Sequence, residues 1–312
     1  MEKQYGVPVA VIVFNRVALA ERILRCLEQI KPEKLFIISD GPRERLIGEE
    51  EKVAQVRALF QKVSWPCEIY RNYSEKNMGC DFRVPTGVDW VFEHVEQAII
   101  LEDDCIPSLD FFQYAEDMLK KYQEDPRIMM VSGSNLAIGY EIKNSCCFTA
   151  RVYTWGWATW RRAWRYYCDG RSEWDRIQKD GTLAKIYSLR TRYYVKRELN
   201  YYFDKGKCPW DYLWWISCMG RGGLCTVPKV NLITNEGFGE NATHTQNRGG
   251  YTGESYPMDF PLVFPEKVER DKMFDRYDSD LNPPWIIVRA YRKIFRCVKK
   301  FIKLQTEENN TI

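Results

Sequence analysis

The stretch VPVAVIVFNR, residues 7–16, decides the fold. Its first part, Val7–Phe14, is apolar and rich in β-branched residues, which favours a strand buried on both faces. Strands of this kind occur in parallel sheets, because helices cover both faces of such a sheet. The run ends at Asn15 and Arg16, and a helical spacing of apolar residues begins at Ala20. A strand followed directly by a helix is the repeating unit of an α/β sheet.

The same alternation continues through the first half of the chain. Four further strands are predicted at Leu35–Ser39, Glu68–Asn72, Ala98–Leu101 and Ile128–Val131. Helices are predicted at 20–30, 53–63, 81–94 and 111–122, from apolar residues three and four positions apart. This order predicts a mostly parallel sheet joined by right-handed crossovers.

Composition divides the chain into three segments. Residues 1–134 carry the strand–helix alternation, whereas 135–258 are rich in aromatic residues and loops. Residues 259–312 are predicted to be a mobile linker followed by a basic tail, which has seven basic and two acidic residues from Trp285 onward. Apolar residues recur at helical spacing there, so we expect an amphipathic helix that lies on an anionic membrane surface or, alternatively, folds onto the protein's own core.

Charge and cysteine content exclude several classes of protein. The net charge of +3 comes from the tail, so the rest of the chain is nearly neutral and general nucleic-acid binding is not expected. The eleven cysteines are scattered without a C-x-x-C pair, which indicates reduced thiols in the cytoplasm. We expect neither a signal peptide nor a membrane-spanning helix, since no apolar run approaches roughly 18 residues.

Several common catalytic motifs are missing from the sequence. It contains no G-x-G-x-x-G after the first strand, no G-x-x-x-x-G-K-[ST] and no G-x-S-x-G, which argues against a dinucleotide site, a P-loop and a nucleophile elbow. The only histidines are His94, expected to be structural, and His244, so a histidine-rich zinc site is excluded. The remaining candidates for chemistry are carboxylates.

Polar residues follow four of the predicted strands, at 15–16, 40–43, 77–79 and 102–104. Because ligands of such sheets bind beyond the carboxyl ends of the strands, these residues are expected to meet at one edge. Residues 102–104 are three consecutive acids, Glu-Asp-Asp, whose repulsion a divalent cation with oxygen ligands would offset. The alternative is that they are solvated residues near the start of a helix.

Six ordered stretches resemble a known family. They are VIVFNR (11–16), ISDGPRE (38–44), NMG (77–79), ILEDDCIPSLDFF (100–112), TWGWATW (154–160) and NLITNEGFGENATHT (231–245). Together they resemble bacterial glycosyltransferases of the GT-A fold from surface-polysaccharide pathways and, more distantly, the N-acetylglucosaminyltransferase I family. The resemblance implies an α/β GT-A fold, in which a Rossmann-like, mostly parallel sheet binds the donor in residues 1–134. A smaller mixed subdomain, residues 135–258, would bind the acceptor, and the amphipathic helix would follow.

The resemblance also implies roles for individual residues. It implies that Asp104 binds Mn²⁺ or Mg²⁺, and that His244 either binds the same ion or donates to the leaving phosphate. It also implies that Asp40 accepts a hydrogen bond from uracil, although an ordinary turn at Asp40 is an alternative. Residues expected to contact the donor are Asn15, Arg16, Asp40, Asn77, Gly79, Arg83, Glu102, Asp103 and Trp157. Trp157, with Trp155, is expected to offer an indole face to a sugar or to pack in the core.

Asp211 is the candidate catalytic base. It lies among tryptophans in a segment where the family carries a carboxylate that faces the acceptor, and it could take the proton of the attacking hydroxyl. The next residue, Tyr212, departs from the paired acids of the N-acetylglucosaminyltransferases. The alternatives are that Asp211 pairs with Arg221 or caps a helix, and Glu236 is the second candidate for the base.

The expected function is therefore a metal-dependent, inverting transfer of a sugar from a UDP-sugar to a glycan or lipid-linked glycan acceptor. It would take place in surface-polysaccharide synthesis, on the inner face of the cell membrane. Retaining transfer and an oligomeric state stay open. The competing functions are a nucleotidyltransferase, which would need a Gly-rich basic loop after the first strand, and a non-catalytic nucleotide- or carbohydrate-binding protein on the same scaffold.

Overall fold

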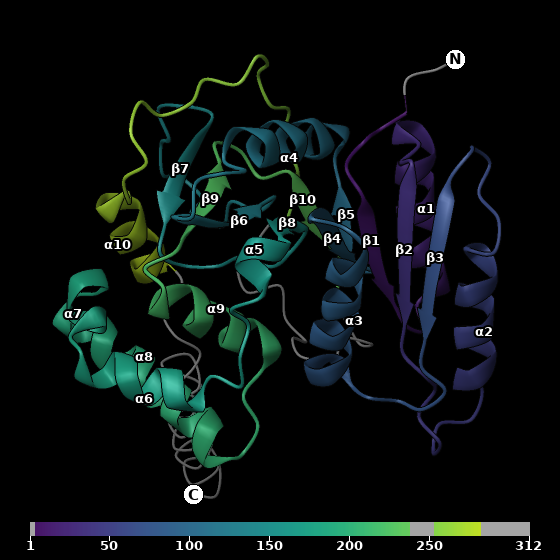
Figure 1. The fold of residues 1–312 in the computed structure, drawn as a ribbon, viewed down its shortest axis with the longest axis horizontal. Coiled ribbons are helices and arrows are strands. Elements are labelled where there is room, and N and C mark those ends of the chain that lie inside the picture. Colours follow the sequence, from purple (N-terminus) through teal and green to yellow (C-terminus); the bar gives the residue numbers. More distant parts are fainter. Residues whose placement is uncertain (1–3, 238–252, 282–312) are drawn as a thin grey trace, which may run out of the picture.

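The computed structural model describes residues 4–237 and 253–281, which form a mixed α/β fold (Figure 1). One sheet of eight strands runs through it in the order β3-β2-β1-β4-β8-β6-β9-β7. Its strands are β1 (Val9–Val13), β2 (Lys34–Ser39), β3 (Glu68–Tyr73), β4 (Gln97–Glu102), β6 (Ile128–Ser132), β7 (Cys146–Thr149), β8 (Trp157–Trp160) and β9 (Leu224–Pro228). A second sheet pairs β5 (Cys105–Pro107) with β10 (Ile233–Asn235).

The first four strands in the sheet, β3, β2, β1 and β4, are parallel to one another. The helices α1 (Val17–Ile30), α2 (Glu49–Leu59) and α3 (Cys80–His94) connect them, and α4 (Leu109–Lys121) leads from β5 to β6. β8 then pairs antiparallel with both β4 and β6, while β9 is parallel to β6 and antiparallel to β7. The five predicted strands and four predicted helices are confirmed, and so is a large, mostly parallel sheet.

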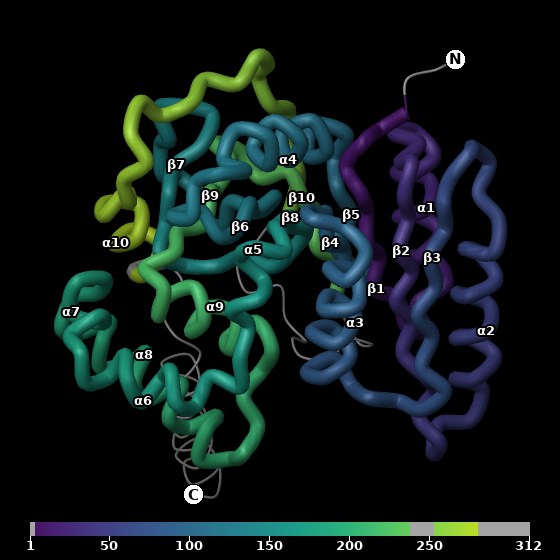
Figure 2. The backbone as a smooth tube through the Cα atoms, in the orientation of Figure 1, coloured from purple at the N-terminus to yellow at the C-terminus, as the bar shows by residue number. Residues whose placement is uncertain are grey.

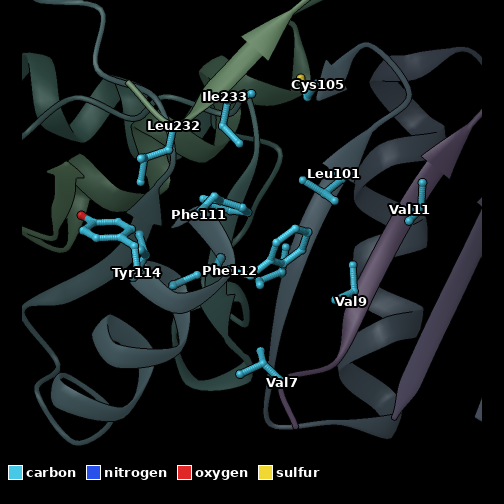
Figure 3. Close-up of a cluster of buried hydrophobic side chains, with 14 of the residues drawn as sticks. Val7, Val9, Val11, Leu101, Cys105, Phe111, Phe112, Tyr114, Leu232 and Ile233 are labelled. Atoms are coloured by element: carbon cyan, nitrogen blue, oxygen red, sulfur yellow. The ribbon is translucent and has the colours of Figure 1, made fainter. Parts of the chain in front are cut away.

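The β-branched run of the first strand is explained by its two buried faces. Val9, Val11 and Val13 belong to the core on the side of α1 and α4, which Figure 3 shows in close-up. Ala10 and Ile12 point the other way, into the core beneath α3. Every residue of β1 is therefore buried, and polar residues can appear only where the strand ends.

A helical layer follows in the second half of the chain. It consists of α5 (Arg161–Trp164), α6 (Arg171–Lys179), α7 (Thr182–Ile186), α8 (Leu189–Asp204) and α9 (Trp210–Gly220). Its own core contains Trp174, Leu199 and Ile216. The tube in Figure 2 shows α6, α7 and α8 at the end of the molecule opposite β1, β2 and β3, with α9 between them and the sheet.

The segment predicted as a mobile linker is packed against the second half as far as it is described. Ser145 exchanges two hydrogen bonds with Val263, each of 2.8 Å, and Leu262 is only 8% exposed. The chain then forms α10 (Lys272–Leu281), whose Asp278 is paired with Arg151 at 2.6 Å. The predicted basic tail helix lies outside the described residues. Within them, no helix has the length and apolar content needed to span a membrane.

Candidate functional site

The polar strand ends meet at the point where the strand order reverses. β1 pairs with β2 on one side and with β4 on the other, so the chain leaves β1 outward to β3 and later returns to β4. In open α/β sheets the ligand crevice lies at this position, beyond the carboxyl ends of the two diverging strands. Arg16 follows β1 here, and Glu102 is the last residue of β4.

Arg16 holds two of the three consecutive acids. Its Nη1 atom lies 2.8 Å from Oδ1 of Asp103 and 2.8 Å from Oδ2 of Asp104. The other oxygen of Asp103 accepts a hydrogen bond of 3.2 Å from the backbone N–H of Phe14. Burial alone would lower the pKa of Arg16, but the charges of Asp103 and Asp104 outweigh it and raise that pKa. We call Arg16, Glu102, Asp103 and Asp104 the acidic cluster.

The acidic cluster carries more negative charge than Arg16 can balance. Burial raises the pKa of Asp103 to about 6, although Arg16 opposes the shift. Burial raises the pKa of Glu102 well above its usual value, and the charges of Asp104, Asp103 and Asp211 raise it further. Among the residues that the structure describes, the three carboxyl groups of the acidic cluster lie next to one guanidinium, which favours the approach of a cation or of a ligand rich in hydrogen-bond donors.

The charge of Asp211, from the second half of the chain, acts on the acidic cluster. It lies in the first turn of α9, and its charge acts on Glu102 at the end of β4. The predicted alternative, a pairing with Arg221, does not fit, because Arg221 is the residue after the last turn of α9, roughly 15 Å away along a helix of this length. Arg221 instead lies over the ring of Tyr166, 4.3 Å from its centroid. An acid in a first helical turn also interacts favourably with the helix dipole.

Hydrogen bonds from neighbouring residues fill the acceptor positions of the Asp40 carboxylate. Its carboxylate accepts hydrogen bonds from the backbone N–H groups of Gly41 at 2.9 Å, Met78 at 2.8 Å and Gly79 at 2.9 Å. A fourth comes from the side-chain amide of Asn77 at 3.0 Å. A carboxylate has about four acceptor positions, so Asp40 fixes the turn at 77–79 and a nucleobase would have to displace one of these donors.

Arg83 binds the strand ends that precede Asp40 and the turn at 77–79. It is 4% exposed and donates to the backbone carbonyl of Ser39 at 3.3 Å and to the side chain of Asn72 at 2.8 Å. These bonds join the ends of β2 and β3. The structure therefore corrects the prediction that Arg83 contacts the donor directly, since its guanidinium is buried and used within the sheet.

Asn15 contacts a residue that the sequence analysis missed. Its side-chain amide donates to Glu49 at 2.8 Å, and Glu49 is also paired with Arg43. The hydrogen bonds from Arg43 lower the pKa of Glu49 despite its burial. The only sequence signal for this site is an acidic run, 49–51, at the start of a helix, which is common in proteins.

Trp157 packs in the core and has no face for a sugar. It is 0% exposed and is surrounded by Trp164, Trp210 and Trp214, with ring centroids 5.8–6.2 Å away. The predicted stacking on the donor is corrected accordingly. Of the two readings for this residue, core packing is the one observed.

The chain returns to the acidic cluster after β10. The backbone N–H of Glu236 donates to the carbonyl oxygen of Asp104 at 2.8 Å, and the Glu236 side chain is paired with Arg22. The next residue, Gly237, lies against the Asp104 carboxylate so closely that a Cβ atom would collide with it. Glu236 thus lies beside the acidic cluster, but its side chain is already paired with Arg22. The sequence did not predict this pairing.

The charge of the acidic cluster suits a divalent cation, but the described residues supply too few grouped ligands to hold one. Carboxylate oxygens are suitable ligands for Mn²⁺ and Mg²⁺. Within 4–237 and 253–281, however, no three His, Cys, Asp or Glu side chains are grouped to hold a metal ion. The second predicted ligand, His244, lies outside the described residues. The Nδ1 atom of His94 donates to the backbone carbonyl of Trp90 at 2.8 Å, which is a contact within α3.

Comparison with known proteins does not identify the chain. No protein-family model matches the sequence, and no curated protein matches it. Among solved structures, one similar to this fold is a cytidylyltransferase from Leptospira borgpetersenii serovar Hardjo-bovis (strain JB197). The TM-score is 0.35 at 11% identity, over 68% of this chain and 92% of that chain, which is too low to bear on function. The family resemblance of the sequence motifs stays a prediction.

Proposed function

We propose that this protein is a glycosyltransferase that uses a nucleotide-sugar donor, with UDP-sugars as the expected class. The observation that carries the proposal is the placement of Arg16 and of the acids Glu102 to Asp104 at the switch point of the sheet, where the charge of Asp211 from the second half of the chain also acts on Glu102. A crevice at that point binds nucleotides in many α/β proteins. Asp211, which comes from the helical layer, adds a carboxylate that can act on the acceptor.

The donor diphosphate would bind beside Arg16. This guanidinium lies at the start of α1, where backbone N–H groups and the helix dipole also favour anions. Mn²⁺ or Mg²⁺, bound by Asp104 and by His244, would stabilise the negative charge of the departing diphosphate. Arg16 would then exchange part of its contact with Asp103 and Asp104 for phosphate oxygens.

Asp211 would act on the acceptor. An inverting transfer needs one base, which removes the proton of the attacking hydroxyl while positive charge develops at the anomeric carbon. The neighbouring Trp210 and Trp214 are buried and do not contact a sugar, but they hold the first turn of α9 in place. The acceptor is proposed to be a glycan or a lipid-linked glycan, and the basic tail a membrane contact.

The variant Asp211→Asn tests the proposal. We expect turnover of the UDP-sugar to fall at least 100-fold, as for loss of a general base, while UDP binds with unchanged affinity. The matched control is Asp204→Asn, at the exposed end of α8, which should keep both properties. Turnover and calorimetric UDP binding are measured with and without Mn²⁺. Full turnover by Asp211→Asn would remove it as the base, and failure of the wild type to bind any nucleotide would refute the proposal.

A nucleotidyltransferase is the second candidate. It would consume a nucleoside triphosphate and a sugar phosphate and release pyrophosphate, and it would bind the triphosphate in a Gly-rich basic loop after the first strand. Here only Phe14, Asn15 and Arg16 separate β1 from α1. This short connection favours the glycosyltransferase. Release of pyrophosphate without transfer from any nucleotide-sugar would favour the alternative.

A further inference from the structure

One face of α8 presents aromatic, apolar and cationic side chains to the outside of the molecule. Leu189, Tyr193, Arg197, Tyr201 and Lys205 follow one another at intervals of four residues, and we call them the α8 face. Residues four apart are neighbours on a helix surface. Leu189 is 78% exposed and Tyr193 is 60% exposed, although both side chains are large and hydrophobic.

The opposite side of α8 is what attaches the helix to the protein. Val195 and Leu199 are buried in the core of the helical layer. Glu198 turns inward and accepts a hydrogen bond of 2.8 Å from the hydroxyl of Tyr212 in α9. The α8 face is therefore not needed for the core, and its apolar residues are exposed on a helix that is already fixed in place.

The segment of sequence that carries this face is basic. Residues 185–207 contain seven basic residues and two acidic ones. One of the acids is the inward-facing Glu198, which leaves Asp204 as the exposed acid of that stretch. This charge is of the same sign and size as that of the sequence after Trp285, but it lies in a different part of the chain.

Tyrosine and leucine beside lysine and arginine match the interface of an anionic bilayer. Tyrosine rings lie well at the boundary between headgroups and acyl chains, and basic side chains extend toward the headgroups. We propose that the α8 face is a lipid-contacting surface that binds an anionic membrane. This surface would be a membrane contact in addition to the one proposed for the basic tail, and it lies within the described residues. The proposal does not depend on the sugar-transfer reaction.

The arrangement also has a geometric consequence. α8 is followed directly by α9, whose first turn carries Asp211, and Lys207 between them is paired with Asp81 of α3 at 3.5 Å. Figure 1 shows α8 at the end of the molecule away from β1, β2 and β3, on the side of α9. The α8 face is therefore joined through a short connection to the helix that carries Asp211, the proposed base.

Photocrosslinking in the full chain tests the contact at a single residue. The variant Tyr193→p-benzoylphenylalanine is mixed with phosphatidylglycerol vesicles and illuminated, and lipid adducts are measured by mass spectrometry. The control is Tyr256→p-benzoylphenylalanine, at another exposed tyrosine, 48% exposed, outside the helical layer. We expect at least tenfold more lipid adduct at position 193. Equal yields, or protein–protein adducts alone, would overturn the proposal in favour of tail-only binding or of a second copy.

Charge reversal provides the second measurement. Arg197→Glu with Lys205→Glu should weaken partition of the full chain onto these vesicles roughly tenfold or more, because each basic residue near an anionic surface contributes to binding. Arg25→Glu with Lys52→Glu, exposed on α1 and α2, is the matched control and should change partition little. An equal loss in both pairs would show a non-specific charge effect and contradict the assignment. UDP binding measured without vesicles tests the proposed function separately.

Discussion

Asp40 and Arg83 anchor the edge of the sheet where the candidate site lies. Asp40 accepts three hydrogen bonds from the turn that follows β3 and a fourth from the N–H of Gly41, and Arg83 joins the ends of β2 and β3. Both were predicted to touch the donor. The hydrogen bonds make Arg83 a positioning residue, and they show that Asp40 fixes the turn, while its predicted contact with the donor stays a prediction.

Replacing Asp40 should loosen this turn. In Asp40→Asn one acceptor oxygen becomes a donor that faces backbone N–H groups, so we expect the free energy of unfolding to fall by about 2–3 kcal/mol. Hydrogen exchange at Met78 and Gly79 should accelerate in the same variant. Urea unfolding measures the first effect, with Asp204→Asn as the control, for which we expect a change within about 0.5 kcal/mol. Wild-type stability and exchange in Asp40→Asn would contradict the role.

The sequence predicted the acidic cluster but not the pairs around it. The meeting of Arg16 with Asp103 and Asp104 follows from two parallel strands that end at one edge. Glu49 and Arg22 were missed, because each is paired with residues from a distant loop or helix. Such contacts depend on the tertiary arrangement and leave no periodic signal in the sequence.

At the scale of elements, the helices and strands of the first half were predictable and most of those in the second half were not. A buried parallel strand such as β1 shows as a continuous apolar run, and amphipathic helices such as α1 and α4 show as a repeat. β7 and β8 have only four residues each. β8 lies in an aromatic stretch that suggested ligand contact, whereas its Trp157 is a core residue.

Asp275 in α10 is expected to make the stability of the protein depend on pH. Its Asp275 is buried and accepts a hydrogen bond from Thr149, and burial raises its pKa from an ordinary 3.8 to about 6. The folded protein therefore binds this proton more tightly than the unfolded chain. The stability contribution is fully present below about pH 4 and is lost as the pH rises through about 6.

Asp275→Asn should remove this dependence. We expect the free energy of unfolding of the wild type to decline by up to about 3 kcal/mol more than that of the variant between pH 4 and pH 7. Urea unfolding across that range measures both curves, and Asp204→Asn again serves as the exposed control. Parallel curves for the wild type and Asp275→Asn would show that this carboxyl does not titrate as described.

At the scale of the whole molecule, both halves of the chain contribute to the candidate site, and the extended segment 253–271 packs against both of them. Residues 253–271 bind Asp110 in the first half and Ser145 in the second half, and they lead into α10, which the Arg151–Asp278 pair holds to the rest of the protein. Composition predicted a mobile linker here, because Pro-rich sequence without periodicity is typical both of linkers and of packed extended segments. The approach of Asp211 to Glu102 likewise follows from the placement of α9, which no local pattern encodes.

The central claim is that a nucleotide diphosphate binds where β1 and β4 diverge. A crystal structure of the full chain with UDP and Mn²⁺ tests it most directly. The account predicts diphosphate oxygens in contact with Arg16, the metal ion bound to Asp104, and Asp211 facing the position of the donor sugar. UDP bound at another part of the molecule, or Arg16 still closed on Asp103 and Asp104 at saturating UDP, would contradict it.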